Sequence, residues 1–261
     1  MRAGDYRYFD TRFVALAHRG GALLPDNVGR ENTMHAFRQA AALGFRYIET
    51  DVHATRDGRL VAFHDHVLDR MTGVSGEVSR ASLRDLEALR VGGHDPIPTL
   101  DEVLETLPDV RFNIDLKSDA AVEPLAAALR SHGAEDRVCV GSFSARRLKV
   151  FRALAGPAVA TSVGPWGVLV DAYAPLVRRL NATRGVALQI PAAFGATGCR
   201  LLHPGLIAAA HRAGRVVHVW TVDEARDMHR LIDIGVDGIV TDRPDILKTV
   251  LVERDLWDGA T

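Results

Sequence analysis

Short apolar stretches typical of β-strands alternate with helical patterns along almost the whole chain, and this alternation limits the possible folds most strongly. Eight stretches suit buried strands: 13–18, 45–52, 111–117, 137–143, 158–163, 185–191, 215–222 and 237–242. Helical patterns lie between them, at 31–44, 99–108, 120–133, 144–156, 170–181, 203–214 and 222–235. Eight strand–helix units in 261 residues predict an α/β fold, the (β/α)8 TIM barrel. An open doubly wound sheet is the alternative, but no Gly-x-Gly-x-x-Gly motif follows the first strand.

The stretch RYIETDVHATRDGRLVAFHD, residues 46–65, is typical of a β-hairpin whose second arm, 60–65, leaves the barrel. Arg56-Asp57-Gly58 supplies the turn signal. A turn centred on Asp57-Gly58 pairs residues whose numbers sum to about 115, which predicts His64 opposite Asp51. The stretch 66–98 that follows is less regular and contains one helical pattern, at 79–90.

Composition excludes several classes of protein. A formal charge of −1 without a run of Lys or Arg gives no reason to expect a nucleic-acid partner. The sequence contains no apolar segment long enough for a membrane span and no apolar signal core near its start, so we expect a cytoplasmic protein. Cys139 and Cys199 are the only cysteines, and reduced thiols are expected for them.

Acidic side chains gather where predicted strands end, which is the end of a TIM barrel that carries active sites. Period-two alternation places Glu49 with Asp51, and Asp115 with Lys117, on one face of each strand. If these faces point inward, three carboxylates converge near the barrel mouth. Like charges at short range raise pKa values or recruit a cation, and oxygen ligands suit a hard ion such as Mg²⁺ or Ca²⁺.

Two histidines are expected beside these carboxylates. His18 ends the first strand, and the hairpin returns His64 to the same neighbourhood. A histidine pair can remove a proton from a nucleophile and protonate a leaving oxygen near neutral pH. Arg19 and Lys117 add positive charge, which suits a phosphate better than a carbonyl group.

Other polar residues have weaker assignments. Gln189 and Ser142 are candidates for substrate hydrogen bonds, and Trp220 suits either a pocket wall or the core. The remaining expectations are a packed barrel histidine at His218, surface or supporting positions for His53, His66 and His94, an ion pair within Asp242-Arg243, and a helix start at Glu31-Asn32-Thr33.

Seven motifs occur in one order over most of the chain: HRG at 18–20, ENT at 31–33, Glu49-x-Asp51-Val52, His64-Asp65, NIDLK at 113–117, VWTV at 219–222 and TDRP at 241–244. Together they resemble the glycerophosphodiester phosphodiesterase family. The resemblance implies one TIM-barrel domain over 1–261, with a small insertion at about 65–98 after the hairpin of the second strand. It also implies metal-dependent hydrolysis of a small-molecule glycerophosphodiester to glycerol 3-phosphate and an alcohol.

The same resemblance implies a role for each matching side chain. The metal ligands would be Glu49, Asp51 and Asp115 around one divalent ion, Mg²⁺ or Ca²⁺; the acid/base pair would be His18 and His64; Arg19 and Lys117 would contact the phosphate, and Trp220 would line the pocket. A water molecule or a hydroxyl of the substrate would attack phosphorus. Which histidine is the acid stays open, as do the released alcohol, the physiological metal and the oligomeric state.

Three positions depart from the family pattern. Arg30 stands where Pro is common, the loop 21–30 is longer than usual, and Asp115 stands where Glu is frequent. The loop lies on the catalytic face, where it would reshape the pocket or act as a lid.

Two other functions stay open. A lysophospholipase D-like enzyme would need an apolar groove, for which Leu23, Leu24, Trp166 and Phe194 are candidates. A metabolite-binding barrel without catalysis is the second alternative, although such a barrel would not need both histidines.

Overall fold

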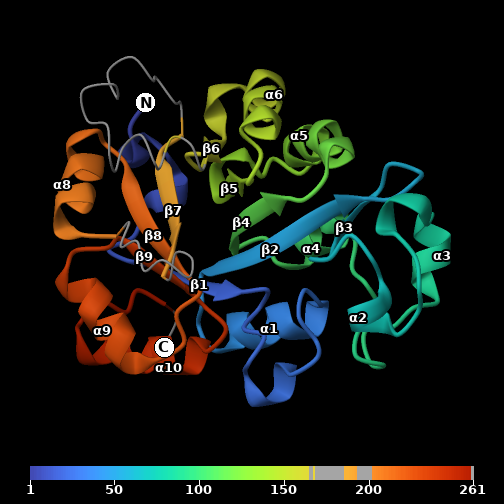
Figure 1. Cartoon of the computed structure of the whole chain (residues 1–261), viewed down its shortest axis with the longest axis horizontal. Helices are drawn as coiled ribbons and strands as arrows, with labels where there is room; N and C mark the ends of the chain where they lie inside the picture. Colours follow the sequence, from blue (N-terminus) through green and yellow to red (C-terminus); the bar gives the residue numbers. More distant parts are fainter. Residues whose placement is uncertain (165–166, 168–184, 193–201, 260–261) are drawn as a thin grey trace, which may run out of the picture.

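Eight parallel strands form a nearly closed barrel in the computed structural model, which describes residues 1–164, 167, 185–192 and 202–259. The strands are β1 (Val14–His18), β2 (Tyr47–Ala54), β4 (Arg111–Leu116), β5 (Val138–Gly141), β6 (Ala160–Thr161), β7 (Ala187–Pro191), β8 (Val216–Trp220) and β9 (Gly238–Thr241). They pair in the order β6-β5-β4-β2-β1-β9-β8-β7, and a parallel bridge from Ser162 to Ala187 joins the two ends (Figure 1). The predicted barrel is therefore confirmed, and the open sheet is wrong.

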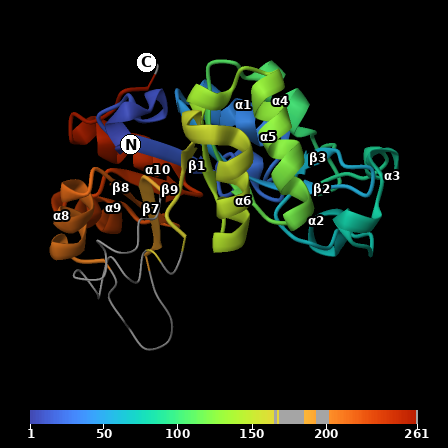
Figure 2. The same cartoon turned by 90° about the horizontal axis from the view of Figure 1, so that it is seen from above.

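Helices cover the outside of this barrel (Figures 1 and 2). They are α1 (Met34–Ala42), α4 (Leu100–Thr106), α5 (Val122–Ser131), α6 (Ala145–Ala155), α8 (Pro204–Arg212), α9 (Ala225–Asp233) and α10 (Pro244–Glu253). Capping side chains set several starts: the Thr33 hydroxyl accepts from Ala36 N, and Thr99 accepts from Glu102 N. The predicted helix at 170–181 lies outside the described residues. The sequence patterns did not include α10, which begins with Pro244 at its first position.

The strands separate two apolar layers, as expected for a TIM barrel. The outer layer lies between strands and helices and includes Phe37, Phe112 and Phe151. The inner layer fills the barrel and includes Leu16 and Tyr47. The alternation of side chains along each strand, seen in β1 and β2, produces both layers at once.

The N-terminal segment, which the sequence patterns left unassigned, closes the bottom of the barrel. It forms two short 3₁₀ helices, η1 (Ala3–Asp5) and η2 (Arg7–Phe9). Tyr8 is fully buried and packs edge-to-face on Tyr47 at the start of β2, with ring centroids 5.3 Å apart. The Tyr47 hydroxyl donates to the Tyr8 carbonyl oxygen at 2.6 Å. This plug blocks the N-terminal ends of the strands and leaves the opposite end for chemistry.

The hairpin after β2 has a register that differs by one residue from the prediction. Its second arm, β3 (Leu60–Ala62), pairs Val52 with Ala62, and Phe63 N donates to Asp51 O at 3.0 Å. Phe63, and not His64, therefore lies opposite Asp51. The reason is a three-residue turn centred on Asp57, with Gly58 in the left-handed region at φ 76°.

Residues 63–98, called the lobe below, form a small unit beside the barrel (α2 and α3 in Figure 1). The lobe contains α2 (Asp69–Thr72), η4 (Val78–Arg80) and α3 (Leu83–Glu87) around an apolar cluster that includes Met71 and Leu86. The predicted helix at 79–90 is split, because Ser82 caps a new helix through a reciprocal pair with Asp85. That the lobe is an insertion into a single domain stays a prediction.

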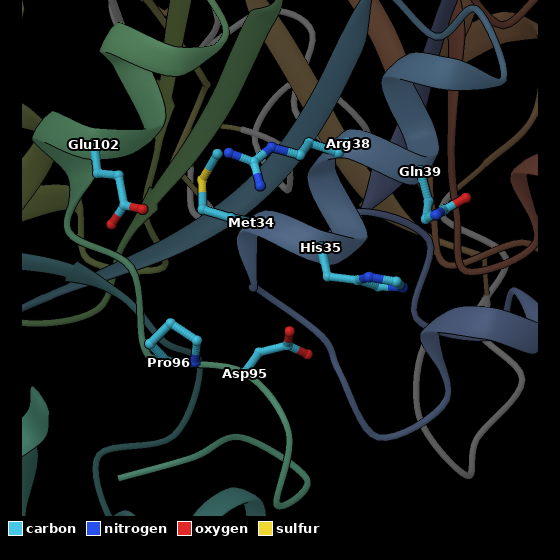
Figure 3. A pocket seen from close by; sticks show the side chains of 7 residues that line it. All are labelled: Met34, His35, Arg38, Gln39, Asp95, Pro96 and Glu102. Carbon is cyan, nitrogen blue, oxygen red and sulfur yellow. The ribbon is translucent and has the colours of Figure 1, made fainter. Parts of the chain in front are cut away.

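A hollow of about 320 Å³ lies where the end of the lobe meets α1 and α4. Asp95 and Pro96 form one wall, and His35 and Arg38 of α1 form another (Figure 3). None of the residues predicted to form the active site lines this hollow.

The structure bears on two expectations drawn from composition, the absence of a membrane span and the reduced state of the cysteines. Across the described residues, every helix is too short or too polar to cross a bilayer. Cys139 is a buried free thiol inside the barrel, and burial raises its pKa to about 12. Cys199 lies outside the described residues.

Candidate active site

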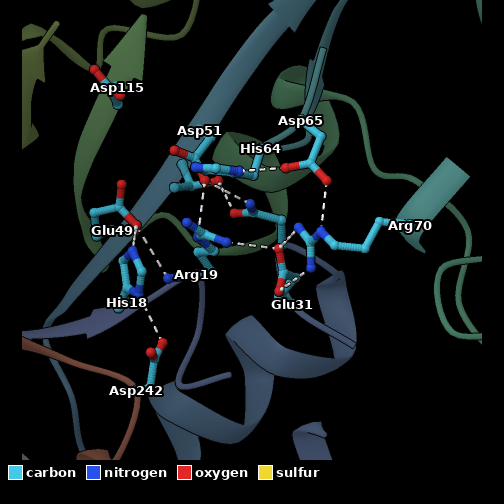
Figure 4. A network of polar contacts seen from close by, with 12 residues as sticks. His18, Arg19, Glu31, Glu49, Asp51, His64, Asp65, Arg70, Asp115 and Asp242 are labelled. Atoms are coloured by element: carbon cyan, nitrogen blue, oxygen red, sulfur yellow. Dashed lines mark hydrogen bonds and ion pairs between the residues drawn. The ribbon is translucent and has the colours of Figure 1, made fainter. Parts of the chain in front are cut away.

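His18, Glu49, Asp51 and Asp115 lie at the C-terminal ends of β1, β2 and β4 (Figure 4), with Arg19 and Lys117 just beyond these ends. Strand register explains this: His18 lies level with Glu49, and Asp51 lies level with Asp115. Because the strands are parallel and adjacent, side chains from 18, 49, 51 and 115 reach one end of the barrel. Of the other predicted site residues, His64 follows β3, and Trp220 ends β8.

His18 is held between two carboxylates. Its Nδ1 lies 2.7 Å from Asp242 Oδ1, and its Nε2 lies 3.7 Å from Glu49 Oε2. A carboxylate only accepts, so Nδ1 carries the proton, and Nε2 is the nitrogen left to face the site. Burial alone would lower the pKa of His18, but the charge of Glu49 and the Asp242 hydrogen bond together raise it.

His64 has the same kind of support from its neighbour in sequence. Its Nδ1 lies 2.6 Å from Asp65 Oδ1, which again assigns the proton to Nδ1. Asp65 Oδ2 accepts from Arg70 Nε at 2.6 Å, and this bond, followed by the one to His64, lowers the pKa of Asp65 to about 2. His53 Nε2 lies 3.1 Å from the His64 carbonyl oxygen, a supporting position as predicted.

The carboxylates differ in how their charge is compensated. Burial would raise the pKa of Asp51, but Lys117 and Arg19 hold it below its usual value. Lys117 Nζ lies 2.9 Å from Asp51 Oδ1 and 2.7 Å from Asp115 Oδ2. Glu49 has weaker support, and burial followed by repulsion from Asp51 raises its pKa well above the usual value.

Arg19 occupies an unusual backbone conformation that brings it over the carboxylates. Its φ of 51° is left-handed, and its N–H donates to Glu49 Oε2 at 3.2 Å. Its guanidinium donates to Glu31 Oε1 at 2.9 Å and lies 3.4 Å from Asp51 Oδ2. Asn32, also left-handed at φ 58°, donates from Nδ2 to Asp51 Oδ2 at 2.9 Å. The ENT motif therefore supports the site directly and does more than begin a helix.

Among the residues that the structure describes, no three acid, histidine or cysteine side chains converge as a ready-made metal site. Lys117 lies against Asp51 and Asp115, and Arg19 lies against Asp51, so cationic side chains compensate part of the negative charge. The donor set nevertheless fits a hard cation, because carboxylate oxygens are its preferred ligands. Burial and repulsion from Asp51 raise the pKa of Glu49, and the charges of His18, Lys117 and Arg19 oppose this rise only in part.

The rest of the mouth contains aromatic and amide side chains. Trp220 is half-buried and meets the exposed ring of Phe143 edge-on, with centroids 5.7 Å apart. Lys117 Nζ lies 6.0 Å from the centre of the same Phe143 ring. Gln189 donates to Asn113 Oδ1 at 2.7 Å. The Ser142 hydroxyl donates to the Leu116 carbonyl oxygen, a structural bond within the barrel.

Several weaker assignments are settled by position. His218 is fully buried, and burial lowers its pKa to about 4, which agrees with a packed barrel histidine. His66 and His94 are exposed, as expected. The predicted Asp242–Arg243 ion pair is wrong, because Arg243 pairs with Asp245 at 2.7 Å and leaves Asp242 to His18.

The long loop 21–30 folds over the ends of β1 and β9. Asn27, in η3 (Pro25–Asn27), donates to the carbonyl oxygens of Gly20 and Gly21, and Leu23 N donates to Asp242 O. Leu24 is buried, and Leu23 is 49% exposed. Trp166 and Phe194 lie outside the described residues, so the proposed apolar groove is untested.

Six side chains complete the site without having been given these roles from sequence: Glu31, Asn32, Asp65, Arg70, Phe143 and Asp242. A carboxylate that follows a strand end is a usable signal for Asp242, and adjacency to His64 is one for Asp65. Arg70 gave no signal, because its partner Glu31 is 39 positions away.

Comparison with known proteins agrees with this geometry. The model of the glycerophosphoryl diester phosphodiesterase family matches residues 18–246. A probable glycerophosphodiester phosphodiesterase 2 of Mycobacterium tuberculosis is 44% identical over 254 residues, which cover 95% of this chain and 94% of that protein. A solved glycerophosphodiester phosphodiesterase from Agrobacterium tumefaciens is 26% identical with a TM-score of 0.75, covering 92% of this chain and 99% of its own.

A phosphodiesterase from Oleispira antarctica, solved in complex with the product sn-glycerol-3-phosphate, has a similar fold. Its TM-score is 0.75 at 23% identity, with coverage of 91% of this chain and 96% of its own. The family model and the 44% identical relative confirm the resemblance predicted from the motifs. The chain therefore belongs to the glycerophosphoryl diester phosphodiesterase family.

Proposed function

We propose that this chain hydrolyses glycerophosphodiesters to glycerol 3-phosphate and an alcohol with one bound divalent metal ion, Mg²⁺ or Ca²⁺. One observation carries the proposal: two histidines, each with a carboxylate on Nδ1, share a barrel mouth with Arg19 and Lys117. A family whose members are named for this reaction supports the same substrate class.

The histidines act as the acid/base pair in this proposal. Asp242 and Asp65 fix the proton of each ring on Nδ1, so that Nε2 of His18 and of His64 exchanges protons with the substrate. One ring takes a proton from the attacking water or substrate hydroxyl. The other returns a proton to the oxygen of the departing alcohol, and the geometry is compatible with either order.

Glu49, Asp51 and Asp115 would hold the metal ion. When bound, the ion supplies Lewis-acid polarisation of a phosphoryl oxygen. Lys117 pairs with two of these carboxylates, so it lies close enough to bind a phosphate oxygen after small side-chain movements. Arg19 offers a guanidinium from the other side, and Trp220 with Phe143 gives an apolar wall for the glycerol or alcohol part.

The decisive experiment is a substrate panel with purified protein that has been treated with a chelator. Glycerophosphocholine, glycerophosphoethanolamine and bis(p-nitrophenyl) phosphate are each assayed with Mg²⁺, Ca²⁺ and Mn²⁺, and lysophosphatidylcholine serves as the lipid arm. We expect metal-dependent release of glycerol 3-phosphate from the first two substrates. If no diester is cleaved with any metal, the chain is a non-catalytic barrel; cleavage confined to the lipid would establish the lysophospholipase D alternative.

A further inference from the structure

Arg70 of the lobe reaches from outside the barrel to two carboxylates beside the candidate active site (Figure 4). Its Nε donates to Asp65 Oδ2 at 2.6 Å, and its two terminal nitrogens donate to Glu31 Oε1 and Oε2 at 2.7 and 3.2 Å. The contact with Glu31 is bidentate, which is the geometry that orients a carboxylate most strongly.

Each of these carboxylates also contacts a side chain to which the proposed function gives a role at the substrate. Asp65 uses its other oxygen, Oδ1, to accept from His64 Nδ1 at 2.6 Å. Glu31 Oε1 accepts from the Arg19 guanidinium at 2.9 Å. Arg70 is thus the middle of an unbroken chain of contacts, His64–Asp65–Arg70–Glu31–Arg19.

Arg70 is more exposed than the two carboxylates that it contacts, and this difference favours a positioning role for Arg70. The Arg70 side chain is 48% exposed, whereas those of Asp65 and Glu31 are 20% and 14% exposed. An exposed ion pair alone contributes little to stability, so holding the lobe in place is a weak reason for this arrangement. Two partly buried carboxylates without Arg70 would be free to turn toward solvent, and His64 and Arg19 would lose their orientation.

We propose that Arg70 is a positioning residue through which the lobe sets the orientation of both His64 and Arg19. The lobe is then part of the catalytic machinery, because it supplies the cation that aligns a proton-transfer group and a phosphate-binding group together. This inference rests on the proposed phosphodiesterase function, since it assigns His64 and Arg19 their roles in that reaction.

A second ion pair, between Arg30 of the loop 21–30 and Asp95 of the lobe, provides a matched control. Arg30 Nε and one terminal nitrogen donate to the two oxygens of Asp95 at 2.5 and 2.8 Å. Asp95 lines the hollow beside α1 together with His35 and Arg38 (Figure 3), and neither His64 nor Arg19 lines it. Loss of this pair should weaken the attachment of the lobe, and Asp95 makes none of the hydrogen bonds of Arg70.

The test compares wild type, Arg70→Met, Arg70→Lys and Asp95→Asn by kcat and KM for glycerophosphocholine and by thermal unfolding. We expect kcat/KM to fall about 10- to 100-fold in Arg70→Met, through both a lower kcat and a higher KM. Arg70→Lys should recover part of the loss, because one ammonium can contact only part of the two carboxylates. Asp95→Asn should stay within about threefold of wild type while its Tm falls at least as much as that of Arg70→Met.

A second readout is independent of turnover: the Nδ1–H resonance of His64 in ¹H–¹⁵N NMR, assigned by its absence from His64→Gln. We expect a hydrogen-bonded signal in wild type and Asp95→Asn, and a broadened or missing one in Arg70→Met. Unchanged kinetics and an unchanged signal in Arg70→Met would overturn the inference, as would equal kinetic losses in Asp95→Asn. If wild type cleaves no diester, the proposed function fails, and the NMR signal alone decides whether Arg70 positions His64.

Discussion

Asp242→Asn is the substitution that isolates the electrostatic support of His18. The Asp242 side chain accepts from His18 Nδ1 at 2.7 Å, and the amide of Asn can still accept this bond with its oxygen. What disappears is the negative charge beside a ring that is protonated during catalysis. A hydrogen bond to a charged group contributes about 1.5–3 kcal/mol and a neutral one about 0.5–1.5 kcal/mol, so the loss is about 1–1.5 kcal/mol. At about 1.4 kcal/mol for each factor of ten, kcat should fall about 5- to 12-fold.

The assay is release of glycerol 3-phosphate from glycerophosphocholine, with Arg243→Gln as the control. Arg243 is the next residue, but its guanidinium pairs with Asp245, so this control should lose less than about threefold. The pKa of His18 should also fall in Asp242→Asn, because the Asp242 hydrogen bond is one of the causes that raise it. If kcat of Asp242→Asn stays within threefold of wild type, His18 does not depend on this carboxylate and the reasoning is refuted.

Three further results are expected. Asp51→Asn should weaken Mg²⁺ or Ca²⁺ binding at least about tenfold by isothermal titration calorimetry with an unchanged circular dichroism spectrum, and unchanged affinity would remove Asp51 from the ligand set. Thr33→Ala removes the hydroxyl that caps α1 and should lower the free energy of unfolding by about 1 kcal/mol in urea titrations, and an unchanged midpoint would show that the cap is dispensable. In a Cys199→Ser variant, the buried Cys139 thiol should resist a thiol reagent until the protein unfolds, and rapid labelling of the native protein would contradict its burial.

The barrel was predictable because the signals that specify it are local. Each buried strand is a short apolar run, and helices such as α1 and α4 have an apolar face and a capping side chain, Thr33 or Thr99. The plug around Tyr8 was not predictable, since two three-residue 3₁₀ helices carry no periodicity. The hairpin register was wrong by one residue because the turn at Asp57 has three residues, and turn length cannot be read from Asp57-Gly58 alone.

The site was predictable where residues lie on neighbouring strands. Glu49 and Asp51 are two residues apart on β2, and Asp51 lies level with Asp115 of β4, so period-two alternation places them at the same end of the barrel. Contacts that depend on long side chains or on tertiary packing were not predictable. Lys117 bridges two of the acids and Arg70 reaches across from the lobe, and neither partner choice has a sequence signature.

The most direct test of the proposed reaction is a ³¹P NMR time course of glycerophosphocholine with purified protein and Mg²⁺ or Ca²⁺. The proposal predicts that the diester resonance disappears and that glycerol 3-phosphate replaces it, with choline as the second product. His18→Asn and His64→Asn should leave the diester unchanged on the same timescale. Appearance of phosphocholine would show that the other P–O bond breaks, and a persistent diester with wild-type protein would contradict the proposed function altogether.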